Sequence, residues 1–175
     1  MRIAFTGSHR VGKTSLAEAI AAYLPDYESI EEPYLQLESK GYLFPEVPTT
    51  EDYIAQFRYS LQQIANSPGH TIFDRSPLDL LAYIHVTDRN KNIETQYQEM
   101  MMTMAQIDLI VYVPVETTDR VACEKHDLPR LRLEVDEVLQ EWIEDLDNDI
   151  ITVSGPLSNR LLQVQQKIQA ILQAR

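Results

Sequence analysis

Hydrophobic and polar positions follow two different periods along this chain. Short apolar runs predict buried strands, and longer stretches with apolar residues three and four positions apart predict helices. The apolar runs predict strands at about residues 2–6, 27–31, 70–73, 109–113 and 149–153. The helical stretches cover about residues 13–24, 50–67, 77–87, 94–105, 132–146 and 156–173, with one more beginning near Thr118. Because strands and helices alternate, the pattern predicts an α/β fold in which helices flank a five-stranded parallel sheet in three layers.

Proline and glycine separate these elements. Residues 33–50 contain three prolines and one glycine, which predicts a partly irregular segment over the edge of the sheet. Pro68-Gly69 ends one helical stretch, and Pro77 opens another at a position that favours proline. With 175 residues and no internal repeat or linker, the chain is predicted to form a single domain over residues 1–175.

Residues 7–14 read Gly-Ser-His-Arg-Val-Gly-Lys-Thr and match the phosphate-loop pattern G-x-x-x-x-G-K-[ST]. The motif lies between a predicted strand and a predicted helix. Such a turn aims backbone N–H groups and the positive end of the helix dipole at a polyphosphate. Lys13 is expected to reach the β- and γ-phosphates of a nucleotide, and the Thr14 hydroxyl group to ligate Mg²⁺. The expected nucleotide-binding residues are Gly7, Ser8, His9, Arg10, Val11, Gly12, Lys13, Thr14 and Ser15.

Two further groups of charged residues follow predicted strands. Asp74 and Arg75 end the third strand, and Glu31 and Glu32 end the second. Ligands of open α/β sheets bind beyond the carboxyl ends of the strands. Asp74 is therefore a candidate to hold Mg²⁺, directly or through water, and Arg75 to contact a phosphate or the substrate. Glu32 is a candidate to accept a proton from an attacking hydroxyl group, although two solvated acids at a strand end would explain the same pattern.

Charge and composition argue against several classes of protein. A net charge of −12 argues against a nucleic-acid-binding surface and against binding to an anionic membrane. No apolar run approaches the length of a membrane span, and the chain enters its first strand almost at once, so neither an anchor nor a signal peptide is expected. The single cysteine, Cys123, is consistent with a cytoplasmic location. The acidic run from Glu134 to Asp147, which includes Asp136, is interpreted as a solvated helix face.

Taken together, the motifs resemble the deoxynucleoside kinases. That family carries a phosphate loop, then Glu-Pro after the second strand and Glu-Arg-Ser after the third. This chain has residues 7–14, Glu32-Pro33 and Asp74-Arg75-Ser76 in the same order. The Asp-Arg form also resembles the thymidylate kinases and nicotinamide riboside kinase-like AAA-domain proteins. The resemblance implies a P-loop kinase fold with Glu32 as the general base. It also implies that Arg75 holds the substrate and the transferring phosphate, and that Asp74 replaces a Glu and serves Mg²⁺.

The resemblance also implies a lid that closes over the phosphates, here at about residues 117–133. Arg120, Arg130 and Arg132 lie in or near this region, and one of them is expected to stabilise charge on the transferred phosphoryl group. Surface arginines that balance an acidic helix would look the same. The aromatic–Gln pair with which the family grips the base has only a reversed match here, so the acceptor stays open. The candidate residues of the substrate pocket are Tyr34, Tyr53, Gln56, Phe57 and Arg58.

Other P-loop proteins match the sequence less well. A GTPase would need D-x-x-G after the third strand and N-K-x-D for guanine, and neither residues 74–77 nor residues 90–93 match. An AAA-type or ABC-type ATPase would usually carry Asp-Glu where this chain has Asp-Arg. A degenerate binding module is disfavoured because Lys13 and Thr14 are both present. The alternative that stays open is a P-loop ATPase or nucleotide-binding regulatory protein without a small-molecule acceptor.

The sequence therefore predicts a cytoplasmic P-loop kinase that transfers the γ-phosphate of ATP to a hydroxyl group of a small nucleoside- or nucleotide-like molecule. The expected cofactors are Mg²⁺ and ATP as phosphoryl donor. The expected partners are ATP and the acceptor, without nucleic acid or membrane, and a homodimer is left open. The expected catalytic residues are Lys13, Glu32, Arg75, Arg130 and Arg132, and the expected metal ligands are Thr14 and Asp74.

Overall fold

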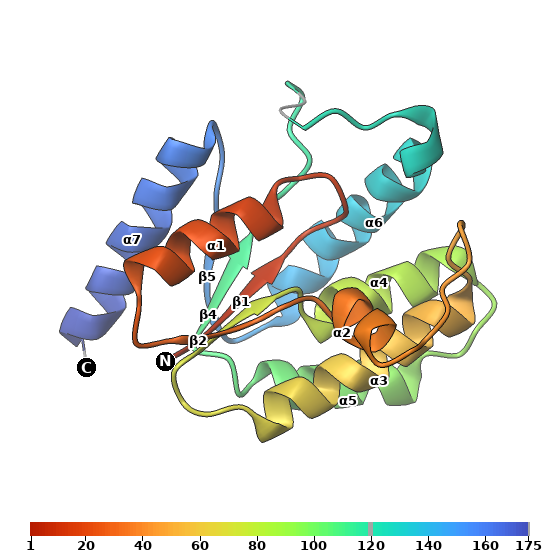
Figure 1. The fold of residues 1–175 in the computed structure, drawn as a ribbon, viewed down its shortest axis with the longest axis horizontal. Coiled ribbons are helices and arrows are strands. Elements are labelled where there is room, and N and C mark those ends of the chain that lie inside the picture. The colour runs from red at the N-terminus through yellow and green to blue at the C-terminus, as the bar shows by residue number, and fades with distance from the viewer. Residues whose placement is uncertain (119–120, 175) are drawn as a thin grey trace.

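The computed structural model describes residues 1–118 and 121–174 and contains a five-stranded, all-parallel sheet (Figure 1). The strands lie in the order β2-β3-β1-β4-β5, so β1 is central and β2 and β5 form the edges. The strands are β1 (Arg2–Thr6), β2 (Glu28–Ile30), β3 (Thr71–Asp74), β4 (Leu109–Tyr112) and β5 (Asp149–Thr152).

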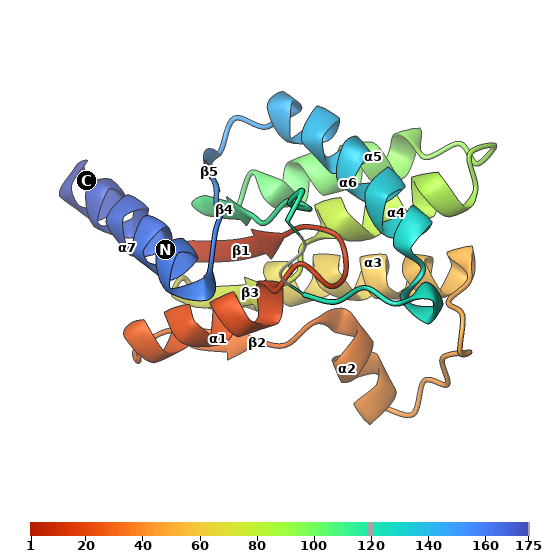
Figure 2. The ribbon, with the colours of Figure 1, turned by 90° about the horizontal axis from the view of Figure 1, so that it is seen from above.

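Helices cover both faces of this sheet (Figures 1 and 2). On one face α1 packs against α7, and on the other α4 packs against α3, α5 and α6. The prediction of a three-layer α/β fold is therefore confirmed. Among the described residues, none of the helices combines the length and hydrophobicity that crossing a bilayer requires. The helices are α1 (Lys13–Tyr23), α2 (Pro33–Ser39), α3 (Thr50–Asn66), α4 (Pro77–Thr87), α5 (Glu94–Met104), α6 (Pro129–Trp142) and α7 (Leu157–Ala174).

The central strand shows why both faces of the sheet are covered. Successive side chains of a strand point to opposite faces. Ile3 and Phe5 accordingly join the apolar cluster under α1 and α7, while Ala4 joins the cluster under α3, α4 and α5. Ile3 and Phe5 are fully buried, and burial of each such side chain contributes about 1.5–3 kcal/mol. The sheet is therefore packed on both faces, and the turns at its carboxyl edge begin from this core.

Residues 33–50 are partly irregular, as predicted, because residues 40–49 form turns and coil. Residues 33–39 within this segment form the helix α2, in which Pro33 occupies the first helical position, where its missing N–H costs nothing. The helix expected from Thr118 is not found among the described residues before a 3₁₀ turn at Lys125–Asp127. Leu128 has a left-handed backbone (φ 52°) that separates this turn from α6, which starts at Pro129.

One residue of the acidic run is not solvated as predicted. Asp136 on α6 is 4% exposed and faces the sheet. It accepts hydrogen bonds from the Tyr112 hydroxyl (2.8 Å) and from the Val115 N–H (3.2 Å). The interpretation of this residue as part of a solvated face is therefore wrong: position 136 is on the side of the helix that packs against β4, and its carboxylate is used to bind the end of that strand.

Candidate active site

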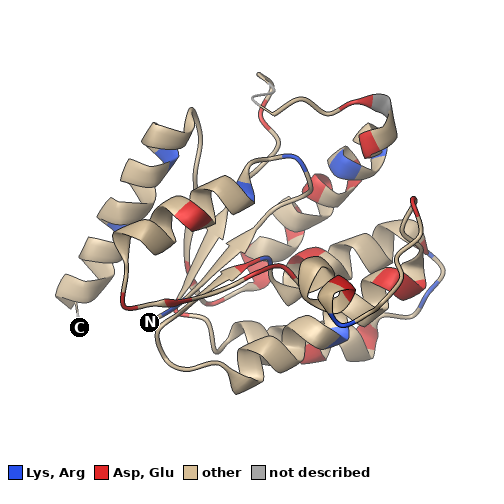
Figure 3. Ribbon diagram, viewed as in Figure 1, with Lys and Arg blue, Asp and Glu red and all other residues tan. Residues whose placement is uncertain are grey.

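The polar residues singled out in the sequence meet at the carboxyl edge of the sheet. The phosphate loop leaves β1, Glu32 follows β2, Asp74 ends β3 and Arg75 follows it. Phe5 of β1 pairs in register with Asp74 of β3, so the loop begins next to that carboxylate. Figure 3 shows acidic positions mainly on the layer of α3 to α6, with basic positions interspersed, whereas α7 carries basic positions only. Because the chain as a whole has a net charge of −12, a site for an anion has to be built locally.

Gly7 is the residue at which the loop needs glycine most. Its φ is 149°, and a Cβ atom added there would lie 2.3 Å from the carbonyl oxygen of Val113. That oxygen belongs to the backbone directly after β4, which is hydrogen-bonded to the central strand, so moving it would disturb the sheet. The first turn of the loop therefore depends on the absence of a side chain.

We expect Gly7→Ala to destabilise the fold by about 2 kcal/mol or more and to abolish nucleotide binding, because the added methyl group displaces the loop. Gly41→Ala is the matched control, since Gly41 also has a positive φ (91°) but an added Cβ there meets no atom of the described residues within 4 Å. Urea denaturation and ATP titration would measure both effects. Equal behaviour of the two variants would contradict the steric argument.

Cations hold the carbonyl oxygens of the phosphate loop. Lys13 Nζ donates to the Ser8 carbonyl (2.6 Å). Arg132 donates through Nε to the His9 carbonyl (3.1 Å) and through Nη2 to the Arg10 carbonyl (3.0 Å). Arg160 Nη1 donates to the Val11 carbonyl (2.6 Å). These bonds offset the negative ends of the peptide dipoles that an incoming polyphosphate would otherwise face.

Lys13 is buried at this point in the loop, with 6% of its surface exposed. Burial lowers its pKa to about 8, the positive charge of Arg75 adds to this, and Asp79, Asp74 and Glu32 oppose it. Nearby, the Ser8 hydroxyl oxygen is buried and has no hydrogen-bond partner among the described residues. A desolvated ammonium group and an unsatisfied hydroxyl group are the features expected of a site that an anion completes.

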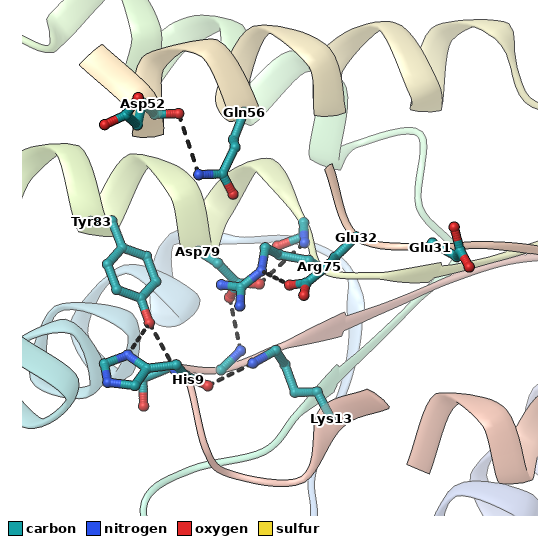
Figure 4. A network of polar contacts seen from close by, with 12 residues as sticks. His9, Lys13, Glu31, Glu32, Asp52, Gln56, Arg75, Asp79 and Tyr83 are labelled. Atoms are coloured by element: carbon teal, nitrogen blue, oxygen red, sulfur yellow. Dashed lines mark hydrogen bonds and ion pairs between the residues drawn. The ribbon is translucent and has the colours of Figure 1, made fainter. Parts of the chain in front are cut away.

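Glu32 and Arg75 form an ion pair on the other side of the loop. Arg75 Nε donates to Glu32 Oε2 at 3.0 Å (Figure 4). Burial acts to raise the pKa of Glu32, but Arg75 and Lys13 outweigh it and hold the pKa below its usual value. The Arg75 backbone has a φ of 118°, a strained conformation for a residue with a side chain. Neighbouring Glu31 points away from the pair and accepts from Gln36 instead (2.9 Å).

Asp74 lies beside Thr14, its predicted partner in holding Mg²⁺. Burial raises the pKa of Asp74, and a hydrogen bond from the Thr14 side chain partly opposes this. Among the described residues, no group of three or more His, Cys, Asp or Glu side chains could hold a metal ion. A hydroxyl group and a single carboxylate fit Mg²⁺, which is usually bound by few protein ligands together with substrate phosphates and water.

Two hollows flank the phosphate loop. One, of about 220 Å³, is lined by Glu32 and Arg75 together with Tyr53, Gln56 and Tyr83. The other, of about 480 Å³, lies against Gly12, Ser15, Gly155 and Arg160. Of the other expected pocket residues, Tyr34 lines the first hollow, Phe57 is buried in the apolar core and Arg58 is exposed.

The expected lid arginines have different surroundings. Arg132 is 4% exposed and donates to carbonyl oxygens of the phosphate loop, as described above. The Arg130 side chain is 92% exposed and pairs with Glu134 (2.6 Å), and Arg120 lies outside the described residues. The expected lid region does contact the loop: Asp127 pairs with Arg10 (2.9 Å), and its carbonyl oxygen binds His9 Nε2.

Sequence reasoning missed three residues that the structure places at the loop. Asp79 and Tyr83 of α4 bind the N–H groups of Gly7 and His9. Ser76 and Asp79 form a capping box, and its S-x-x-D spacing is visible in the sequence. Arg160 binds Val11 across 149 positions of the chain, and no local signal marks it.

Comparison with known proteins supports the same fold. A protein-family model described as an AAA domain matches residues 2–160. No curated protein matches the chain.

Three solved structures are similar to the chain. Deoxyadenosine kinase from M. mycoides, with the products dCMP and dCDP bound, has a TM-score of 0.69 at 17% identity over 98% of this chain and 100% of that chain. NadR in complex with NR has a TM-score of 0.70 at 18% identity, over 97% of this chain and 50% of that chain. Thymidylate kinase from Candida albicans has a TM-score of 0.68 at 15% identity, over 97% and 91%. The resemblance to P-loop kinases is thus confirmed for the fold.

Proposed function

The chain belongs to the AAA-domain family whose model matches residues 2–160, and on that premise we propose that it is an ATP-dependent small-molecule kinase. It transfers the γ-phosphate of ATP to a hydroxyl group of a nucleoside- or nucleotide-like acceptor. The observation that carries the proposal is the Glu32–Arg75 pair, which lines a hollow at the edge of the sheet that also holds the phosphate loop. The hollow beside this pair gives an acceptor hydroxyl group a place next to a carboxylate, whereas an ATPase without an acceptor would use the carboxylate on water.

Each residue has a role in this reaction. Lys13 and the loop N–H groups bind the phosphates, and Thr14 and Asp74 hold Mg²⁺, which when bound neutralises charge on the phosphates. Glu32 is ionised at neutral pH because its pKa is lowered, so it can accept the proton of the acceptor hydroxyl group. The oxygen of that group bonds to the γ-phosphorus as the bond to ADP breaks. Arg75 orients Glu32 and stabilises charge on the transferred group.

The charge of the first hollow bears on the acceptor. Of the described residues that line it, Glu32, Glu46 and Asp127 are carboxylates, and Arg75 is the only lysine or arginine. A phosphate group on the acceptor would add negative charge where one arginine is already paired with Glu32. This balance favours an acceptor without a phosphate, such as a nucleoside or nicotinamide riboside, over a nucleoside monophosphate.

The roles of Arg130 and Arg132 belong to the same proposal. Closure of residues 117–133 would have to move Arg130 from its exposed position toward the phosphates, whereas Arg132 already supports the loop. We also propose a cytoplasmic enzyme, with a homodimer left as an open alternative to a monomer.

The test is turnover of Mg²⁺-ATP, alone and with a panel of nucleosides, nucleoside monophosphates and nicotinamide riboside. We expect turnover to rise with an acceptor that carries no phosphate, together with a matching phosphorylated product. Stimulation by monophosphates alone would leave the kinase in place and overturn the charge argument. Steady hydrolysis that ignores every acceptor would overturn the kinase and favour the ATPase.

A further inference from the structure

Helix α4 binds the start of the phosphate loop along one face. The hydroxyl groups of Ser76 and Thr6 lie 2.8 Å apart. Three residues further along, Asp79 Oδ1 accepts from the Gly7 N–H (2.8 Å). Four residues beyond that, the Tyr83 hydroxyl oxygen accepts from the His9 N–H (2.8 Å). Spacings of three and four residues place side chains on the same side of a helix. Successive side chains on this face therefore contact successive residues at the start of the phosphate loop.

Asp79 differs from the other two because it joins two parts of the site. Its Oδ1 accepts from the Gly7 N–H, and its Oδ2 accepts from the Ser76 N–H (3.1 Å). Ser76 directly follows Arg75, which pairs with Glu32. One fully buried carboxylate therefore connects the loop that binds the donor to the turn that carries the acceptor-side pair. Figure 4 shows Asp79 beside Arg75, with Lys13 and His9 below.

We propose that Asp79 is a positioning residue for phosphoryl transfer, which fixes the phosphate loop relative to the Glu32–Arg75 pair. This inference rests on the proposed kinase function. Catalysis of this reaction consists mostly of positioning and charge stabilisation, and a misplacement of about 1 Å can cost about 100-fold in rate. A shift between the two backbones would therefore reduce the rate of the chemical step more than the affinity for either substrate.

The two hydrogen bonds need a carboxylate. Both partners are N–H donors, so an amide at position 79 would turn its NH₂ group toward one of them. The carboxylate is also the counter-charge for Lys13 and Arg75. The other titratable groups that face it are the hydroxyl groups of Tyr83 and Tyr112. Burial raises the pKa of Asp79 to about 6, while Lys13 and Arg75 act to lower it.

The test compares Asp79→Asn with Asp52→Asn. Asp52 is a matched control because it forms the same kind of capping box, at the start of α3, and is 5% exposed. We expect Asp79→Asn to lower kcat by about 10- to 100-fold with both KM values changed by less than about threefold. Asp52→Asn should reduce stability but leave kcat within about threefold of wild type. Asp79→Glu, which restores the charge and the acceptors, should recover part of the lost activity.

The pH profile gives a readout that a purely structural role would not move. In the wild type, kcat should fall as the pH drops through about 6, because a protonated Asp79 cannot accept both bonds. Asp79→Asn should lack this fall, and a fall of the same size in the variant would count against the positioning role of Asp79. Unchanged kcat in Asp79→Asn, or losses equal to those of Asp52→Asn, would overturn the inference. A wild type that phosphorylates no acceptor would overturn the proposed function, and this inference with it.

Discussion

Lys13→Met is expected to abolish phosphoryl transfer and leave the fold intact. Methionine keeps most of the aliphatic side chain but removes the ammonium group, which is the positive charge that the loop is proposed to offer to the β- and γ-phosphates. The loss should exceed ~10³-fold in kcat/KM, because the donor loses both binding and charge stabilisation in the transition state. Coupled-assay kinetics and ATP titration would measure it. Lys167→Met is the control, since Lys167 pairs with Asp149 on the surface (2.6 Å).

The same substitution should not destabilise the protein without ligands. Burial lowers the pKa of Lys13 from 10.5 to about 8, so the charged side chain opposes folding fully below about pH 8. Wild-type stability should rise between about pH 8 and 10.5, where the unfolded chain binds the extra proton. Lys13→Met should lack that rise and should be at least as stable as the wild type at neutral pH. Thermal melts would show this, and Mg²⁺-ATP should raise the melting temperature of the wild type only. A variant that melts far lower would contradict this account.

The parts of the site that the sequence predicts are those with local causes. The phosphate loop is a strand, a glycine turn and a helix in direct succession, and β1 has the predicted bounds. Glu32 and Arg75 were expected at the same edge because both follow strands of a parallel sheet, and the structure shows them paired. What the pattern predicted there was a common location; the pairing itself depends on β2 lying beside β3.

The rest of the site depends on contacts between distant parts of the chain. Arg132 and Arg160 resemble surface arginines in the sequence, because each is a charged residue on a helix that also carries other polar positions, and nothing in the local pattern marks it as buried. Only the packing of those helices brings the guanidinium groups under the carbonyl oxygens of the loop. Asp136 was misinterpreted for a related reason, since a run of acids conceals the one member that faces the sheet. The spacing of apolar residues along the chain therefore does not predict buried polar groups that bind backbone atoms from distant parts of the sequence.

Glu32→Gln is expected to reduce kcat by ~10²-fold or more with little change in ATP affinity, because it removes the base but leaves the phosphate loop untouched. Glutamine keeps the size of the side chain and still offers Arg75 an oxygen, so the arginine should stay in place. Glu31→Gln is a close control: Glu31 is the preceding residue, but its side chain points away from Arg75 and binds Gln36. Single-turnover kinetics would separate the chemical step from product release.

The pH dependence makes this assignment sharper. Because Arg75 and Lys13 outweigh burial and hold the pKa of Glu32 below its ordinary value of 4.5, Glu32 stays ionised down to that range. Any fall of the wild-type rate well above it must come from another group, with Asp79 near 6 as the first candidate. Glu32→Gln should therefore be slow at every pH and still show the fall near 6, whereas Asp79→Asn should lose it. Equal rates for Glu32→Gln and Glu31→Gln would remove Glu32 from the reaction and leave Arg75 with a purely structural partner.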